Sequence, residues 1–417
     1  MSSRAVAGAV NALAGRWASV AGAAGRNTVF SPVGVWPLLG MLAAGAQGAA
    51  RAELAAAAGL PAEAAAEGAR RLLADLGRIP GVATAVGVWT DRRIVPEPGW
   101  VAALPEHGLG ELTGTAAVDR ARLDSWAAEV TGGLIPAMPV ELDEETLLVL
   151  AGGLSVRTRW IRPFADSVLE PEQGPWEGRT LAALARRTAL LDRAAVLRGE
   201  AGAVTELSVL GYDGIEVRLL LGEEGRTPGA VLRTGIGAVS GDGTVERVTA
   251  DVLPAAEAGP GMTVYREASW EPEPNLWVRT VPFTLDSTHD LLRTPAPFGL
   301  TTAADLGQGH FPGVSRSVPL AVGSASQRAV AAFGADGFEA AAVTAFGVAV
   351  GSAAWRRPPY RVRSVAVSFD RPFGFLAVHR ASRLVLAAGW VNETPDLQEP
   401  DYDDDDEDLA DDFRLRG

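Results

Sequence analysis

Residues 340–355 read AAAVTAFGVAVGSAAW, an uncharged run without proline that lies between two strand-like segments near the C-terminus. The surrounding residues, 335–364, form a connection that the pattern predicts to be exposed. An exposed, unpaired hydrophobic strand invites edge-to-edge aggregation. The run is therefore expected either to be buried or to be held in reserve for later insertion into a sheet.

The rest of the chain predicts helices first and strands later. Ser31-Pro32 is a good helix start, because the hydroxyl can accept a backbone N–H and proline suits the first helical turn. Residues 82–90 and 146–156 read as strands, and the second is an apolar run typical of a strand buried on both faces. This order favours an α+β class with large antiparallel-rich sheets.

Six segments carry a resemblance to a known family. They read NTVFSPVGVWPLLGMLAAGA (27–46), SWAAEVTGGLI (125–135), RTRWIRPF (157–164), PFTLDSTHDL (282–291), FGLTTAADLGQGHFPGVS (298–315), and FDRPFGF (369–375) with LVLAAGWVN (384–392). In this order they resemble the serpin (serine protease inhibitor) family. The resemblance implies a serpin domain over residues 6–395, with three β-sheets, about eight to nine helices and an exposed reactive-centre loop.

Composition excludes several classes of function. The 417 residues include no cysteine, so there is no disulfide framework and no thiolate metal site. All 37 basic residues are arginine, a bias typical of a GC-rich, bacterial-type composition. The net charge is −14, and no basic stripe is available to neutralise nucleic-acid phosphates. Residues 62–78 mix arginines with acids, so no heparin-type activator is expected either.

The N-terminus predicts a helix rather than a signal peptide. Residues 2–25 are rich in Ala and Gly, and Asn11 and Arg16 interrupt them. No apolar run reaches the roughly 20 residues that span a bilayer, so no membrane partner is expected. The sequence favours a cytoplasmic monomer, and the family resemblance implies an extracellular location as the alternative.

Enzyme motifs are missing from the sequence. There is no Gly-x-Ser-x-Gly, and the four histidines (His107, His289, His310 and His379) are scattered without an HExxH or an i,i+4 pair. No P-loop or Rossmann glycine pattern follows a strand. We therefore expect no catalytic residues, no metal, no cofactor and no enzymatic activity.

The resemblance implies how residues 337–344 work. Gly337, Phe338, Glu339, Ala340, Ala341, Ala342, Val343 and Thr344 match the family's hinge. In that family a protease cleaves the loop, and the part before the cut enters the main sheet as a strand, which traps the protease. Period-two alternation makes Phe338 the first inward side chain. Since the family has a small residue there, we expect Phe338 to overpack the gap and to slow insertion.

Five further positions correspond to the family's shutter and breach, the regions where its main sheet opens. They are Ser31, Gly34, Gly152, Trp160 and Gln327. Ser31 and Trp160 are kept, whereas Gly34 replaces a Ser, Gly152 an Asn and Gln327 a His. Gln327 can still form hydrogen bonds but cannot titrate. The resemblance therefore implies an opening mechanism that is partly retained and partly rebuilt.

The position of the scissile bond depends on how it is counted. Counting forward from Gly337 by the family's spacing gives Gly351-Ser352, whereas counting back from Phe373 gives Arg361, close to Arg356 and Arg357. We favour Gly351-Ser352, because the length of the inserted strand is the mechanical constraint. This choice implies a serine protease that accepts small residues, elastase-like or subtilisin-like. A serpin-fold binding or scaffold protein that does not inhibit is the alternative function.

Residues 396–417 form an acidic tail. They hold eleven acids and two arginines, a net of −9 out of the total of −14. Their apolar content is too low for packing, so a disordered segment is expected. It is interpreted as a solubilising tail, with binding of a basic partner or loose attraction of divalent cations as alternatives.

Overall fold

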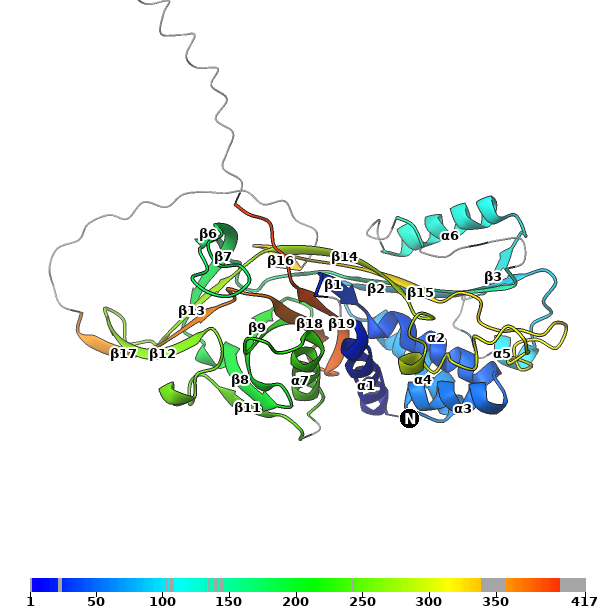
Figure 1. Cartoon of the computed structure of the whole chain (residues 1–417), viewed down its shortest axis with the longest axis horizontal. Helices are drawn as coiled ribbons and strands as arrows, with labels where there is room; N and C mark the ends of the chain where they lie inside the picture. The colour runs from blue at the N-terminus through cyan, green and yellow to red at the C-terminus, as the bar shows by residue number, and fades with distance from the viewer. Residues whose placement is uncertain are drawn as a thin grey trace, which may run out of the picture.

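A computed structural model gives the fold of the chain (Figure 1). It describes residues 2–21, 25–102, 104, 109–131, 133, 136–138, 142, 146–241, 243–338 and 358–397. None of the helices in these ranges is long and apolar enough to cross a membrane.

Seven α-helices and three 3₁₀ turns occur in the described ranges, close to the eight or nine helices expected. The α-helices are α1 (Ser3–Ala21), α2 (Pro32–Gly45), α3 (Gly48–Ala58), α4 (Ala62–Leu76), α5 (Pro98–Val101), α6 (Ala116–Thr131) and α7 (Pro228–Ser240). The 3₁₀ turns are η2 (Leu191–Arg193), η3 (Ala255–Glu257) and η4 (Ala296–Phe298). The predicted start of α2 is confirmed, because Ser31 is its N-cap and the Ser31 hydroxyl accepts the Gly34 N–H.

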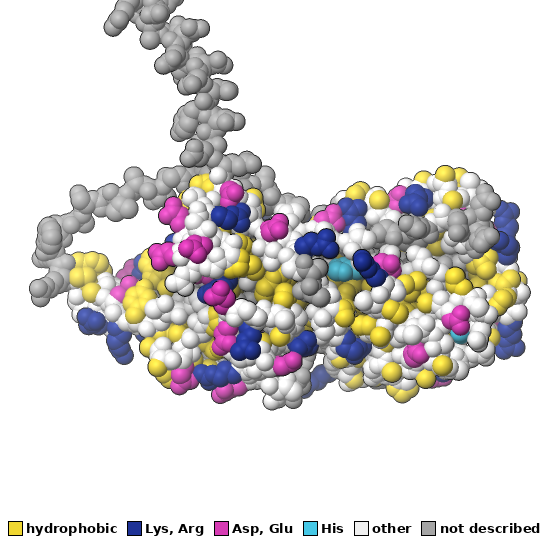
Figure 2. All heavy atoms as spheres, in the orientation of Figure 1, with side chains coloured by type: hydrophobic (Ala, Val, Ile, Leu, Met, Phe, Trp, Pro, Cys, Tyr) yellow, Lys and Arg dark blue, Asp and Glu magenta, His cyan; other side chains and the backbone are white. Residues whose placement is uncertain are grey.

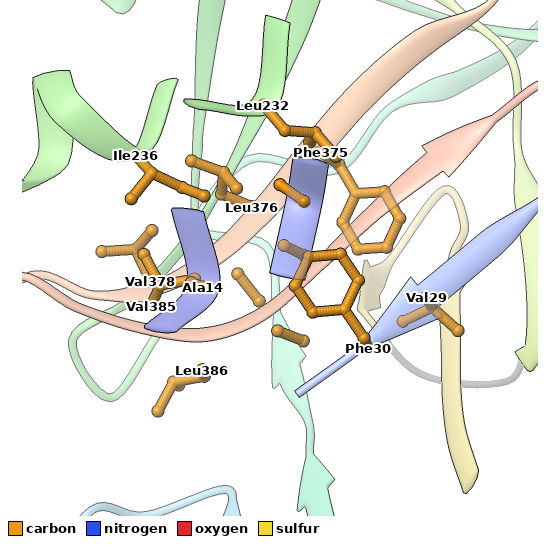
Figure 3. Close-up of a cluster of buried hydrophobic side chains, with 14 of the residues drawn as sticks. Ala14, Val29, Phe30, Leu232, Ile236, Phe375, Leu376, Val378, Val385 and Leu386 are labelled. Carbon is orange, nitrogen blue, oxygen red and sulfur yellow. The ribbon is translucent and has the colours of Figure 1, made fainter. Parts of the chain in front are cut away.

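The largest sheet has seven strands in the order β1-β19-β18-β10-β9-β8-β11. Their bounds are β1 (Thr28–Phe30), β19 (Leu384–Val391), β18 (Phe373–His379), β10 (Ile215–Gly222), β9 (Gly202–Leu210), β8 (Ala194–Gly199) and β11 (Glu246–Thr249). Helices α1 and α7 pack on β18 and β19, and Figure 3 shows their apolar side chains meeting around Phe30 and Phe375. This sheet holds the centre of the hydrophobic core.

A five-stranded sheet has the order β12-β17-β13-β7-β6. Its strands are β12 (Met262–Ser269), β17 (Tyr360–Ser368), β13 (Asn275–Thr280), β7 (Leu181–Thr188) and β6 (Ala165–Leu169). Strand β17 is an inner strand, antiparallel to β12 and parallel to β13. The chain that follows the expected reactive loop is therefore hydrogen-bonded along both edges.

The expected main sheet is divided by its hydrogen bonds into two parts. One has the order β3 (Leu109–Leu112), β2 (Val82–Asp91) and β4 (Leu148–Val156), and the other β14 (Phe283–Asp290), β15 (Ser326–Phe333), β16 (Gly337–Phe338) and β5 (Thr158–Arg159). In Figure 1 they form one long layer, with α6 on one side and α1 to α4 on the other. The expected three sheets thus become four, because no described strand joins β4 to β15.

Candidate functional site

The seam between β4 and β15 is the first feature of the site. These two strands contact each other without sharing a hydrogen-bond ladder. A small cavity of about 20 Å³ lies between them, lined by Gly152, Leu154 and Val156 of β4 and by residues 327–330 of β15. Such a space holds at most one water molecule. The seam is therefore a closed junction between two half-sheets rather than a ligand pocket.

A hydrogen-bonded pair, Ser31 and Gln327, closes the inner side of the seam. The Gln327 amide donates from Nε2 to the Ser31 carbonyl at 2.7 Å, and its Oε1 accepts the Ser31 N–H at 2.9 Å. The Ser31 hydroxyl in turn donates to the Leu386 carbonyl at 2.7 Å. Both residues are buried. The pair thus ties the start of α2 to β15 and β19 with no titrating group of its own.

The two glycines of this region, Gly34 and Gly152, allow α2 to approach β4 closely. A Cβ on Gly152 would lie 2.4 Å from the Gly34 carbonyl oxygen, and a Cβ on Gly34 would lie 2.9 Å from Gln327 Nε2. Neither position can take a larger side chain without movement of the backbone or of Gln327. The structure therefore brings together four of the five positions expected at the shutter and breach, and it gives a steric reason for both glycines.

Trp160 lies apart from these four, at the end of the seam where β5 follows β4. Its indole Nε1 donates to the Gly334 carbonyl at 2.9 Å, and its backbone N–H donates to the Asp336 carbonyl at 2.8 Å. Its ring lies 5.0 Å from the ring of Phe333. Trp160 therefore holds residues 334–336, the turn that precedes the expected hinge.

The first two hinge residues already occupy the end of the seam. In β16, Phe338 pairs with Phe333 of β15 on one side and with Thr158 of β5 on the other. Phe338 is only 2% exposed, and its ring lies 6.0 Å from that of Phe375. The expectation that this ring must enter the gap after cleavage is wrong, because the ring is already buried there in the intact chain.

The remaining loop positions lie outside the described residues. These are the hinge residues Glu339, Ala340, Ala341, Ala342, Val343 and Thr344, the favoured scissile pair Gly351 and Ser352, and Arg356 with Arg357. The alternative cleavage position, Arg361, is described and pairs with Ala268 in the β12–β17 ladder. A protease needs an accessible extended backbone, so this pairing argues against cleavage at Arg361.

His289 lies beside the seam, a position that the sequence did not reveal. It lies opposite Gln327 in the β14–β15 ladder, and its Nε2 lies 2.9 Å from the Val29 carbonyl oxygen. Its ring meets the edges of Trp17 and Phe30 at 5.4 and 6.3 Å. Burial lowers the pKa of His289 below its ordinary value of 6.5, and the hydrogen bond to Val29 opposes that shift in part.

This environment predicts a loss of stability in acid. Because the pKa is lower in the folded state, the unfolded state binds more protons as the pH falls below 6.5. The free energy of unfolding should then decrease by up to about 1.4 kcal/mol per pH unit for this one group. Urea unfolding at pH 7.5 and at pH 5 measures the effect. His289→Gln, which can still donate to Val29, should flatten that difference, and an unchanged difference would rule out His289 as its source.

Part of this chain matches known proteins in sequence. Residues 14–173 match the family model "Serpin (serine protease inhibitor)". The chain is 36% identical over 194 residues to "Putative serpin-Z8" of Oryza sativa subsp. japonica, an alignment that covers 40% of this chain and 44% of the rice protein. Less than half of that relative's length is therefore matched in sequence.

Solved structures extend the likeness of the fold to nearly the whole chain. Native protease nexin-1 with heparin superposes with a TM-score of 0.70 at 17% identity, covering 94% of this chain and 100% of the other. Thyroxine-binding globulin in complex with thyroxine superposes with a TM-score of 0.68 at 17% identity, covering 94% and 99%. At this identity the likeness concerns the fold alone.

Proposed function

Because this chain belongs to the serpin family, we propose that it inhibits serine-type endopeptidases as a suicide substrate. In this mechanism the reactive loop inserts between β4 and β15 after cleavage. The observation that carries the proposal is the seam. Two long strands lie side by side without a ladder, and β16 already begins the missing strand between β15 and β5.

The residues that follow Phe338 suit insertion. By period-two alternation, the side chains that would follow Phe338 into the core are Ala340, Ala342, Thr344, Phe346, Val348 and Val350. All are uncharged, and only Thr344 is polar. An inserted strand could therefore pair its backbone with β4 and β15 and bury this face without leaving a charge in the core.

The proposed reaction begins when the protease serine attacks the Gly351 carbonyl carbon. The peptide bond to Ser352 breaks, an ester to Gly351 forms, and the proton lost by the serine hydroxyl ends on the new amine of Ser352, which stays with the C-terminal part of the fold. The cut releases residues 339–351 from β17, which stays held between β12 and β13. Insertion then carries the ester-linked protease along the sheet before water can hydrolyse the ester.

The class of the target protease follows from the residues at the favoured scissile bond. Small residues flank Gly351-Ser352, so the target should be an elastase-like or subtilisin-like protease. On the face that Figure 2 shows, arginine and acidic side chains are interspersed rather than gathered into one basic patch, which supports inhibition without a heparin-type activator. We propose that the protein acts as a monomer.

A second candidate is a serpin-fold binding or scaffold protein that does not inhibit. The seating of Phe338 favours it, since the end of the seam is sealed in the intact chain. The Ser31–Gln327 pair closes the inner side as well. A seam held at two places could stay closed after the loop is cut.

Incubation with subtilisin and with elastase tests the proposed inhibition. A complex that survives SDS should form, with cleavage after Gly351 and loss of protease activity. Thr344→Arg is the matched control, because it places a charge on the inserting face without changing the residues at the cut. This variant should be cleaved without forming the complex. If the natural chain is also only cleaved while both proteases keep full activity, inhibition is refuted and the binding function is favoured.

A further inference from the structure

Three arginines gather near the end of the five-stranded sheet. Arg186 of β7 donates from NH1 to the Arg162 carbonyl at 2.8 Å, and Arg162 donates from its own NH1 to the Thr188 hydroxyl at 3.3 Å. Arg193 follows in η2. The pKa of Arg186 falls to about 10, first because of burial and then because of the charges of Arg162 and Arg193. Arg162 and Arg193 therefore each lie close enough to Arg186 for their charge to lower its pKa.

This arginine cluster (Arg162, Arg186 and Arg193) lacks compensating negative charge. Among the described residues, no carboxylate lies within ion-pair distance of Arg162 or Arg186, and Arg193 meets only its neighbour Asp192, at 3.4 Å. The Nε atoms of Arg186 and Arg193 are buried without a hydrogen-bond partner in the described part of the chain. Buried donors normally find acceptors. The cluster thus has the properties of an anion site.

The C-terminal segment leaves the described part of the chain beside the same strand. Asp396 forms a bridge with Leu181, the first residue of β7, and also pairs with Arg179 at 2.8 Å. The Leu397 N–H donates to the Thr180 carbonyl at 2.9 Å. The first two residues of the expected tail are therefore fixed to the sheet. Ten acids and two arginines follow in residues 398–417.

The reach of this segment matches the position of the cluster. Arg186 lies five residues along β7 from Leu181, or roughly 17 Å at the rise of a strand. The bridge is antiparallel, so at Leu397 the chain heads away from Arg186 and has to turn back over roughly 20 Å, the length of six strand residues, to reach it. Residues 404–408 follow Leu397 by seven to eleven positions, which allows a span of about 23–40 Å. The acidic run DDDED is therefore long enough to reach the cluster once the chain has turned.

We propose that the acidic segment 398–417 docks on the arginine cluster of its own chain, with carboxylates of residues 404–408 accepting N–H groups of the guanidiniums. Charge complementarity and the short tether both favour this occupant over an acidic segment of another protein, because a tether of this length gives a high effective concentration.

Docking would act on the turn that leads into the hinge. Arg162 lies in the loop between β5 and β6, and at its ends Trp160 N–H donates to Asp336 and Phe164 N–H donates to Ala335. The Phe164 ring also lies under the Arg186 guanidinium, 4.3 Å from its carbon to the ring centroid. The docked segment would thus hold this loop against residues 334–336. This effect does not depend on whether the protein inhibits a protease.

Photo-cross-linking of the full chain tests the docking. The chain has no cysteine, so Tyr402→Cys adds a single attachment point for benzophenone maleimide and leaves every acid in place. Cross-links should map to peptides that contain residues 157–164 and 186–193. Combined Arg162→Gln, Arg186→Gln and Arg193→Gln should lower their yield by roughly tenfold, since the charge-assisted contacts are lost.

The matched control is the combination Arg70→Gln, Arg92→Gln and Arg120→Gln, which removes the same charge from exposed positions on other elements. It should change the yield by less than about twofold, because these arginines belong to α4, to the turn after β2 and to α6 rather than to the five-stranded sheet. If the cluster variant fails to fold, the single substitution Arg162→Gln at an exposed position replaces it. A salt series from about 0.1 to 1 M gives an independent test, because the Debye screening length shortens from about 10 to 3 Å over this range. Cross-links scattered over the surface, insensitive to salt, or equal in both triple variants would overturn the proposal.

Discussion

Cleavage of the loop between Phe338 and Pro358 is expected to raise the melting temperature by on the order of 10–20 °C. An inserted strand would bond its backbone to β4 and β15 and bury apolar side chains, each large one contributing about 1.5–3 kcal/mol. At an unfolding entropy of about 2.1 cal/mol/K per residue, a chain of this size gains roughly 1 °C for each kcal/mol. Calorimetry of the intact and the cleaved protein measures the shift.

Thr344→Arg serves again as the control for this experiment, since it can be cut at the same bond but must bury a charge in order to insert. The cleaved variant should melt where its intact form does. An unchanged melting temperature for the cleaved natural chain would show that the seam does not open, and would favour the binding function. The docking of the acidic segment would be untouched by that result, because its test does not involve the loop.

Truncation of Phe338 should destabilise the intact protein. The side chain is 2% exposed, lies beside the Phe375 ring and is paired in register with Phe333. Phe338→Ala should lower the free energy of unfolding by about 3–5 kcal/mol, the cost typical of a buried ring. Phe338→Leu, which keeps most of the volume, should cost less than about 1.5 kcal/mol. Urea unfolding of both variants with the loop intact measures the difference.

This result also bears on the efficiency of the proposed inhibition. Sequence reasoning alone expects Phe338→Thr to lower the number of inhibitor molecules consumed per protease, since a smaller side chain would enter the gap faster. The ring already lies in the seam before cleavage, so that gain is no longer expected. If Phe338→Ala proves as stable as the natural chain, or Phe338→Thr improves the stoichiometry, the ring is not seated as described.

Local signals in the sequence determined the elements of this protein. Ser31-Pro32 begins α2, and the uncharged run in 146–156 becomes β4, because capping and burial patterns depend on neighbouring residues. The six family-like segments together led to the fold, and with it to the five positions expected at the shutter and breach. The identity of Gln327 was visible in the sequence, but its bonds to Ser31, 296 residues away, were not.

The tertiary structure alone decided how these elements meet. It placed Phe338 inside the seam and set His289 opposite Gln327. It also paired β17 with β12, which removes Arg361 from the exposed loop. Finally, it brought Arg162 and Arg193 close to Arg186, on the strand that anchors the acidic segment. These outcomes depend on strand register and on the close approach of α2 to β4 at Gly34 and Gly152. Register and packing are settled by contacts between residues far apart in the chain, which local propensity does not encode.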